Sequence, residues 1–298
     1  MIVKAMGRTQ LGGPGALQRH RRAHALTVLA IRTAFIAGVL ILWQLAALEF
    51  PREKFIISSP LDIVVRFGEM GRSGELWRHT KVTVEEVAIG YAIGSVCGIA
   101  TGFLFGRSRM LAEIFEPIIV GLYGIPRTAL APLFIIWLGI GIESKVGIVI
   151  LMTFFLTFFN TYSGIKAVDR DLVNLARLMG ASEWVIIRRV ILPAISPAVM
   201  LGLKTSVPQA VIGATVGEFI VSTAGLGYLI RQAAGFFDAG GLYVGVVVLL
   251  ALVLVANYLL DGLERHLLRW RPPAEEHRVE LELTEAGTDS STERLPSC

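Results

Sequence analysis

The sequence predicts an all-α, polytopic membrane protein with six transmembrane helices and a helical loop in the cytoplasm. Of its 298 residues, 54% are hydrophobic and 17% are charged, and the mean hydropathy is +0.64, which is too apolar for ordinary water-soluble domains. Six windows are also long and apolar enough to cross a bilayer, which takes roughly 20 residues. These windows are residues 29–48, 87–106, 117–138, 146–165, 198–221 and 242–260.

The distribution of Lys and Arg predicts that both chain termini lie in the cytoplasm. In this topology the inner connections hold about twice as many basic residues as the outer ones, as the positive-inside rule requires. The outer stretch 52–81 is itself basic, which weakens the bias, but acidic residues intersperse it. We expect a transmembrane domain over residues 25–271, flanked by disordered polar tails at 1–24 and 272–298.

Glycines recur every four residues in the second window, which places them along one stripe of a helix. Without a hydrophobic drive between helices in lipid, close packing over small residues holds two helices together. The partner helix belongs either to the same subunit or to a second one. The stripe comprises Gly90, Gly94, Gly98, Gly102 and Gly106.

Prolines and polar residues inside the windows indicate a possible solute path. Pro126 and Pro208 remove backbone donors, and irregular backbone is tolerated in a bilayer where it is buried in protein or lines a cavity. Arg127 lies about 10 residues into its window, roughly 15 Å deep. It either lines an anion pathway or is satisfied by carbonyls that Pro126 frees.

Three further polar residues occur near the ends of windows. Asn160 can cap or bridge helices, and Lys204 is one to two turns from the cytoplasmic end, where its stem can snorkel. Both join Arg127 as candidates for the translocation path. Glu218 should reach the outer surface and be solvated or paired. In the outer connection, Ser59 and Pro60 begin a helix that lies in the membrane interface or forms a docking surface.

The sequence contains no recognisable catalytic or metal-binding motif. All five histidines lie outside the apolar windows, and neither an HExxH pair nor a GxSxG elbow occurs. Cys97 and Cys298 lack the spacing of a metal site or a disulfide framework. A P-loop is also missing, so any ATPase would have to act from a separate chain.

The most informative segment is the predicted cytoplasmic loop of residues 166–193, KAVDRDLVNLARLMGASEWVIIRRVILP. Asp169 or Asp171 can begin a short helix, which Gly180 ends. Ser182 can cap a second helix that stops before Pro193. The apolar stripe of the first helix comprises Leu172, Leu175, Ala176 and Met179. Such a knob either fills the groove of a partner or lies flat on the membrane.

This loop resembles the EAA loop of permease subunits of ATP-binding-cassette importers. Ala176, Gly180 and Pro193 match that pattern, as do Val190 and Leu192, whereas Asn174 and Leu175 stand where it has glutamate and its first alanine. The segments SSPLDIVVRF, GIPRTALAPLFIIWLGIGIESK, FNTYSGIKAVD and GEFIVSTAGLGYLI are similar to the branch that serves nitrate, sulfonate and taurine uptake. The resemblance covers about residues 58–271.

The resemblance implies a homodimeric permease in the bacterial inner membrane, with two cytoplasmic ATPase subunits and an extracytoplasmic solute-binding protein. It implies that this chain is not an enzyme and binds no cofactor, while its partner uses ATP and Mg²⁺. The residues expected to couple to the ATPase are Leu172, Leu175, Ala176, Met179, Gly180 and Trp184. The main alternative is a self-contained channel or secondary transporter that uses Arg127, Lys204 and Glu218.

Overall fold

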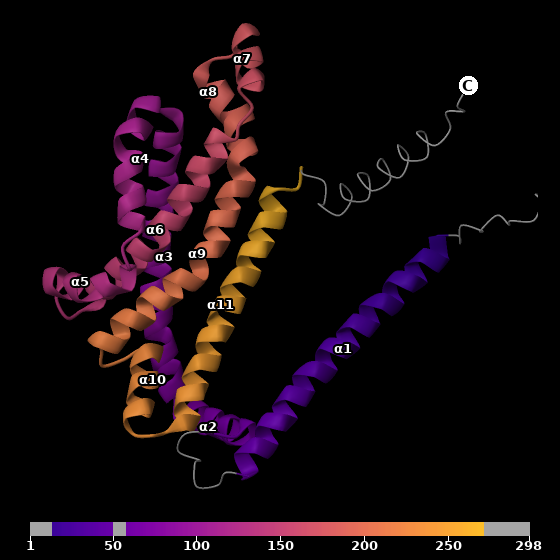
Figure 1. Ribbon diagram of the computed structural model, residues 1–298, viewed down its shortest axis with the longest axis vertical. Helices are drawn as coiled ribbons and strands as arrows, with labels where there is room; N and C mark the ends of the chain where they lie inside the picture. The colour runs from indigo at the N-terminus through magenta and orange to yellow at the C-terminus, as the bar shows by residue number, and fades with distance from the viewer. Residues whose placement is uncertain (1–13, 50–57, 271–298) are drawn as a thin grey trace, which may run out of the picture. The chain divides into compact units, whose positions relative to one another are not determined.

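A computed structural model describes residues 14–49 and 58–270 of the chain (Figure 1). Within these ranges every regular element is helical, which confirms the all-α class. Five helices are long and apolar enough to cross a membrane, and one bent pair of helices brings the number of spans to six. Residues 1–13 and 271–298, which hold most of the expected disordered tails, lie outside the described residues. Residues 14–24 are helical instead, because their arginines and alanines favour continuing helix α1 (Pro14–Glu49) beyond the apolar window.

The first of two compact units comprises Met1–Ser73 and Gln232–Val244. It contains α1, α2 (Pro60–Arg72), the end of α10 (Leu226–Gly235) and the start of α11 (Ala239–Leu267). Ser59 caps α2 as expected, because its hydroxyl accepts from the amide of Asp62 while the Asp62 carboxylate accepts from the Ser59 amide. Arg66 of α2 donates to Asp238 over 2.8 Å, and their ion pair holds α2 to the turn before α11.

The second unit comprises Gly74–Arg231 and Gly245–Cys298, and its centre is α6 (Ile142–Lys166). Helix α6 packs most extensively against α3 (Glu75–Arg107) and α9 (Leu192–Ile220), as Figure 1 shows. Buried side chains of α6, among them Ile148, Met152 and Phe158, fill the space between these helices.

The glycine stripe of α3 lies against α6 of the same chain. A Cβ atom placed at Gly94 would lie 2.9 Å from the carbonyl oxygen of Ile150, and one at Gly102 would lie 2.7 Å from that of Phe158. Such distances leave no room for a methyl group, so the absence of side chains allows the two backbones to touch. The stripe therefore packs within one subunit.

The third apolar window forms two helices rather than one. Helix α4 (Arg109–Tyr123) and the segment 127–138 meet at an angle of 86°. The second segment begins with the 3₁₀ turn η2 (Arg127–Leu130) and continues as α5 (Ala131–Leu138). Pro126 lies at the bend, where its missing donor prevents α4 from continuing. The window at 117–138 is thus interrupted by proline, as predicted, and the break divides it into two helices.

The helix before α9 does not stop at Pro193, contrary to expectation. Short helix α8 (Glu183–Ile186) runs through the π-helical turn η3 (Ile187–Ile191) directly into α9. The amide of Leu192 donates to the carbonyl of Ile187, five residues back, and this wider turn admits the proline ring. At Pro197, which has no amide to donate, the Ser196 hydroxyl donates instead to the carbonyl of Pro193 over 2.8 Å.

Candidate functional site

The loop of residues 166–193 begins with α7 (Arg170–Leu178), a helix closed at both ends. Asp169 caps its start by accepting from the amide of Asp171 over 2.8 Å. At its end, the amides of Gly180 and Ala181 donate to the carbonyls of Arg177 and Ala176, and Gly180 has a φ of +81°. These two bonds form a Schellman motif, which needs a residue in the left-handed region. Gly180 thus sets the direction in which the chain leaves α7.

A cluster of isoleucines fixes α7 and α8 to the spanning helices. Ile186 of α8 is fully buried against Ile165 at the C-terminal end of α6 and Ile195 at the start of α9. Ala176 and Ala181 pack against the same cluster, so the two alanines that close the Schellman motif face inward. The loop therefore moves with the ends of α6 and α9.

Glu183 braces the loop with two ion pairs. Its carboxylate accepts from Arg107 of α3 over 2.7 Å and from Arg177 of α7 over 3.0 Å. Beneath α7 lies a cavity of about 730 Å³, and Asn174, Arg107 and Arg177 all line it. Asn174 has no charge to offer these arginines, so the carboxylate that pairs with them comes from α8 instead.

The opposite side of the loop exposes an apolar surface, which we call the loop surface. Its members are Leu172, Leu175, Leu178, Met179 and Trp184. Leu178 and Met179 are 86% and 80% exposed, and the other three are 55% to 67% exposed. Leu178, the arginines and Glu183 were missed in the sequence, although Leu178 follows Leu175 by three residues and so belongs to the same helical stripe. Ala176 is half-buried against the isoleucine cluster, and Gly180 is exposed but contributes no side chain, so both shape the loop surface without adding an apolar side chain to it.

Arg127 lies in η2, at the break between α4 and α5. Its guanidinium stacks over the ring of Tyr123, 4.6 Å from the ring centroid. Its Nη1 atom is buried and has no hydrogen-bond partner in the described part of the chain. The carbonyl of Pro126 accepts from the amide of Ala129. Arg127 thus lies at a broken helix, as expected, and its half-buried positive charge forms no ion pair with a carboxylate among the described residues.

The other polar candidates lie apart from Arg127 and from one another. Asn160 donates to the carbonyl of Leu156 on its own helix, and its Cβ lies against Gly202 of α9. Lys204 does not snorkel: it pairs with Asp261 of α11 over 2.5 Å and also with Glu264. Glu218 is fully buried and hydrogen-bonded, not solvated at the outer surface. The structure does not assemble Arg127, Lys204 and Glu218 into one ion pathway.

Six apolar spans, one of them broken, and a rigid loop with an exposed apolar surface define an integral membrane component of a transport system. Residues 93–271 match the family described as "Binding-protein-dependent transport system inner membrane component". The chain belongs to this family. It is therefore a non-catalytic, multi-pass inner-membrane permease subunit of an ATP-binding-cassette importer, whose ATP hydrolysis takes place in a separate subunit.

Several relatives named as transport permease proteins are similar to most of the chain. The formylaminopyrimidine transport permease protein ThiX of Halalkalibacterium halodurans is 33% identical over 80% of this chain and 95% of its own length. The riboflavin transport system permease protein RibX of Chloroflexus aurantiacus is 35% identical over 78% of this chain and 87% of its own length. The putative aliphatic sulfonates transport permease protein SsuC of Escherichia coli is 34% identical over 79% of this chain and 89% of its own length.

Solved structures show the same fold. A chain of the MetNI methionine ABC transporter, solved in inward-facing conformations, aligns with a TM-score of 0.58 at 20% identity. The alignment covers 64% of this chain and 95% of the MetNI chain. This alignment shows that the two chains share a fold.

Proposed function

We propose that two copies of this chain form the membrane path of an importer for small anions such as sulfonates, taurine or nitrate. Two ATPase subunits bind the loop surface in the cytoplasm, and a binding protein delivers the solute outside. Both chain termini then lie in the cytoplasm, as the distribution of Lys and Arg favours. ATP and Mg²⁺ bind to the ATPase subunits and no cofactor binds to this chain.

The observation that carries this proposal is the loop surface. Five large apolar side chains are exposed on a loop that helix caps, ion pairs and a buried isoleucine cluster hold in place. An exposed apolar patch on a rigid element is typical of a protein contact, because a partner's groove can bury it without ordering a flexible chain. Closure of the ATPases on nucleotide would move this loop, and with it the ends of α6 and α9, to open the path outward.

The anion preference is supported by Arg127. A half-buried guanidinium, whose Nη1 atom is buried and unpaired among the described residues, lies at the break of a spanning helix and can accept a negative charge at little cost, whereas a second cation there would be repelled. The names of the relatives include aliphatic sulfonates but also a pyrimidine and a flavin. Uptake of labelled taurine, with nitrate, formylaminopyrimidine and riboflavin as competitors, tests the preference.

Replacing Leu175 by Asp tests the coupling role. A charge cannot enter an apolar groove cheaply, so ATP-driven uptake should fall at least about tenfold while the protein still inserts in the membrane. The control is Leu267→Asp, at an equally exposed leucine that ends α11 outside the loop. Unchanged uptake in the Leu175 variant, or uptake without any copurifying ATPase, would remove the proposal in favour of a self-contained channel.

A further inference from the structure

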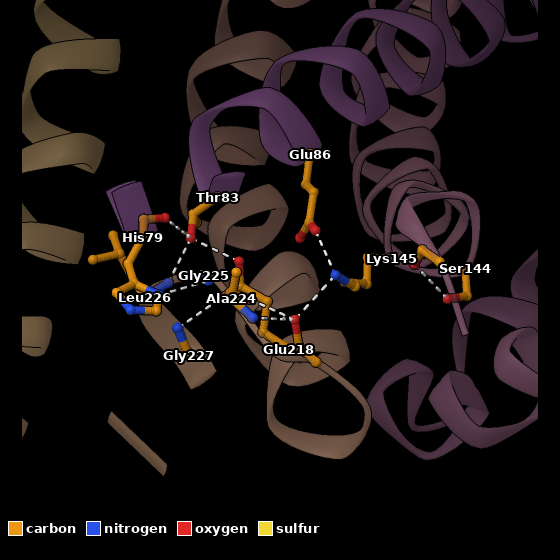
Figure 2. A network of polar contacts seen from close by, with 12 residues as sticks. His79, Thr83, Glu86, Ser144, Lys145, Glu218, Ala224, Gly225, Leu226 and Gly227 are labelled. Atoms are coloured by element: carbon orange, nitrogen blue, oxygen red, sulfur yellow. Dashed lines mark hydrogen bonds and ion pairs between the residues drawn. The ribbon is translucent and has the colours of Figure 1, made fainter. Parts of the chain in front are cut away.

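A buried polar cluster lies at the end of α9 that is opposite to the loop surface (Figure 2). It joins α3, α6, α9 and the first turn of α10. His79, Thr83 and Glu86 of α3 follow each other at intervals of four and three residues, so they share one face of the helix. All three are fully buried, and so is Glu218 of α9.

Three side chains of this cluster cap the start of α10. The amide of Gly225 donates to Nδ1 of His79 over 3.1 Å, and the amide of Leu226 donates to the Thr83 hydroxyl over 2.8 Å. The amide of Gly227 donates to the Glu218 carboxylate over 2.5 Å. A helix leaves its first amides without backbone partners, and here two spanning helices supply the acceptors.

Thr83 links the two spanning helices as well as capping α10. Its hydroxyl donates to Glu218 over 2.6 Å while it accepts from Leu226. Figure 2 shows these groups converging on one point between the helices. A hydroxyl that donates and accepts at once polarises both bonds, so the three groups act as a unit.

The segment before α10 is tied to the same cluster. Lys145 of α6 pairs with Glu86 over 2.7 Å and donates to the Ser222 hydroxyl over 3.1 Å. Gly225 has a φ of +112°, and a Cβ atom at Gly227 would lie 2.8 Å from the Glu218 carboxylate. The two glycines are needed because side chains there would occupy the space of that carboxylate.

We propose that this cluster is a latch that makes Thr83 and Glu218 positioning residues for transport: it fixes α10 to the outer end of α9, so that movement of the loop surface reaches α10. The proposal rests on the proposed coupling role of that loop. Helix α9 has 29 residues and so spans roughly 44 Å, from the isoleucine cluster at one end to Glu218 at the other. One helix therefore holds both the loop and the latch.

The test is Thr83→Val, which keeps the shape of the side chain but removes its bonds to Glu218 and Leu226. Thr80→Val is the matched control, since Thr80 is one turn earlier in α3. Among the residues that the structure describes, its hydroxyl donates only to the carbonyl of Leu76 in the same helix, over 2.7 Å. Thr83→Ser restores the hydroxyl. The full-length permease is purified with its ATPase, and amide hydrogen exchange is measured with and without AMP-PNP.

In the wild type and in Thr80→Val, AMP-PNP should change exchange both at residues 170–191 and at 221–231. In Thr83→Val the change at 170–191 should persist, whereas the change at 221–231 should shrink by about fivefold or more, the lower end of typical allosteric coupling. Thr83→Ser should recover it.

Two results would overturn the latch. One is a response at 221–231 that is the same in Thr83→Val and Thr80→Val. The other is a Thr83→Val protein whose exchange rises along all of α3, α6 and α9 without nucleotide, which would show a purely structural role. Failure of the proposed function gives a different result: AMP-PNP would leave residues 170–191 unchanged in the wild type, or no ATPase would copurify.

Discussion

Gly180 decides how the loop surface is presented, because it alone permits the left-handed turn after α7. Replacing it by Ala meets no atom within 4 Å, so the cost is that of the backbone, about 1–2 kcal/mol. We expect amide hydrogen exchange across residues 170–186 to become faster by the factor to which this free-energy cost corresponds. Gly121→Ala in α4, which also meets no atom within 4 Å but has no positive φ, is the control and should change nothing. Equal exchange in both variants would contradict the role of Gly180.

Arg127 gives the second prediction at the scale of a residue. Arg127→Leu should lower anion uptake about tenfold or more, since a hydrogen bond to a charged group contributes about 1.5–3 kcal/mol. Arg127→Lys keeps the charge and should retain part of the uptake. Copurification of the ATPase reports assembly in the same samples. If uptake and assembly fall together, the arginine is structural and the anion preference loses its support.

The loop residues show how far the sequence leads at this scale. The period of 3.6 predicts the stripe of Leu172, Leu175 and Met179, and the structure exposes all three. The same period includes Ala176, which packs inward because the isoleucine cluster of α6, α8 and α9 covers it. No local pattern distinguishes an exposed member of a stripe from one that a distant segment covers.

The contact between α3 and α6 depends on the glycine stripe at the scale of elements. Gly94→Ala should destabilise the permease by about 1–3 kcal/mol, because the methyl group would overlap the backbone of α6. The thermal midpoint in detergent measures this loss. Gly68→Ala in α2 has open space around it and should be neutral or slightly stabilising, as alanine favours a helix. Equal thermal midpoints in the Gly94 and Gly68 variants would mean that α3 and α6 can move apart to admit the methyl group without loss of stability.

The helices are longer than the apolar windows that predict them. Helix α3 begins at Glu75, whereas its window begins at residue 87, and α6 begins at Ile142 rather than 146. The missing turns carry His79, Thr83, Glu86 and Lys145, which a hydropathy average treats as loop. Lys145 pairs with Glu86, and other partners of these side chains come from Glu218 and the segment 222–227, which only the tertiary structure brings to α3. Oε2 of Glu86 has no hydrogen-bond partner among the described residues. The four- and three-residue spacing in α3 was the signal available in the sequence.

The whole molecule should work as a pair. Two copies would present one loop surface to each ATPase of a pair, so differently tagged copies should copurify from one membrane, together with the ATPase. Mixing separately purified copies in detergent is the control for exchange after extraction. Recovery of one tag alone from coexpressed copies would show that a single chain suffices, or that a different permease completes the transporter.

At the scale of the whole molecule, the angle of the break between α4 and α5 and the π-helical turn before α9 could not be predicted from the sequence. Prolines in the sequence announce irregular backbone, but the 86° bend and the continuous path through Pro193 depend on which carbonyls find new donors. Family membership, by contrast, follows from short motifs spread over nearly the whole membrane domain.

Trp184 lies among the exposed members of the loop surface, 67% open to its surroundings. An indole that passes from water into an apolar groove emits at shorter wavelength, so the molecule contains its own optical reporter of engagement. The chain has five tryptophans, and replacing the other four by phenylalanine would leave this signal isolated. Binding and release of the loop surface during turnover would then appear as a shift in the emission wavelength of Trp184.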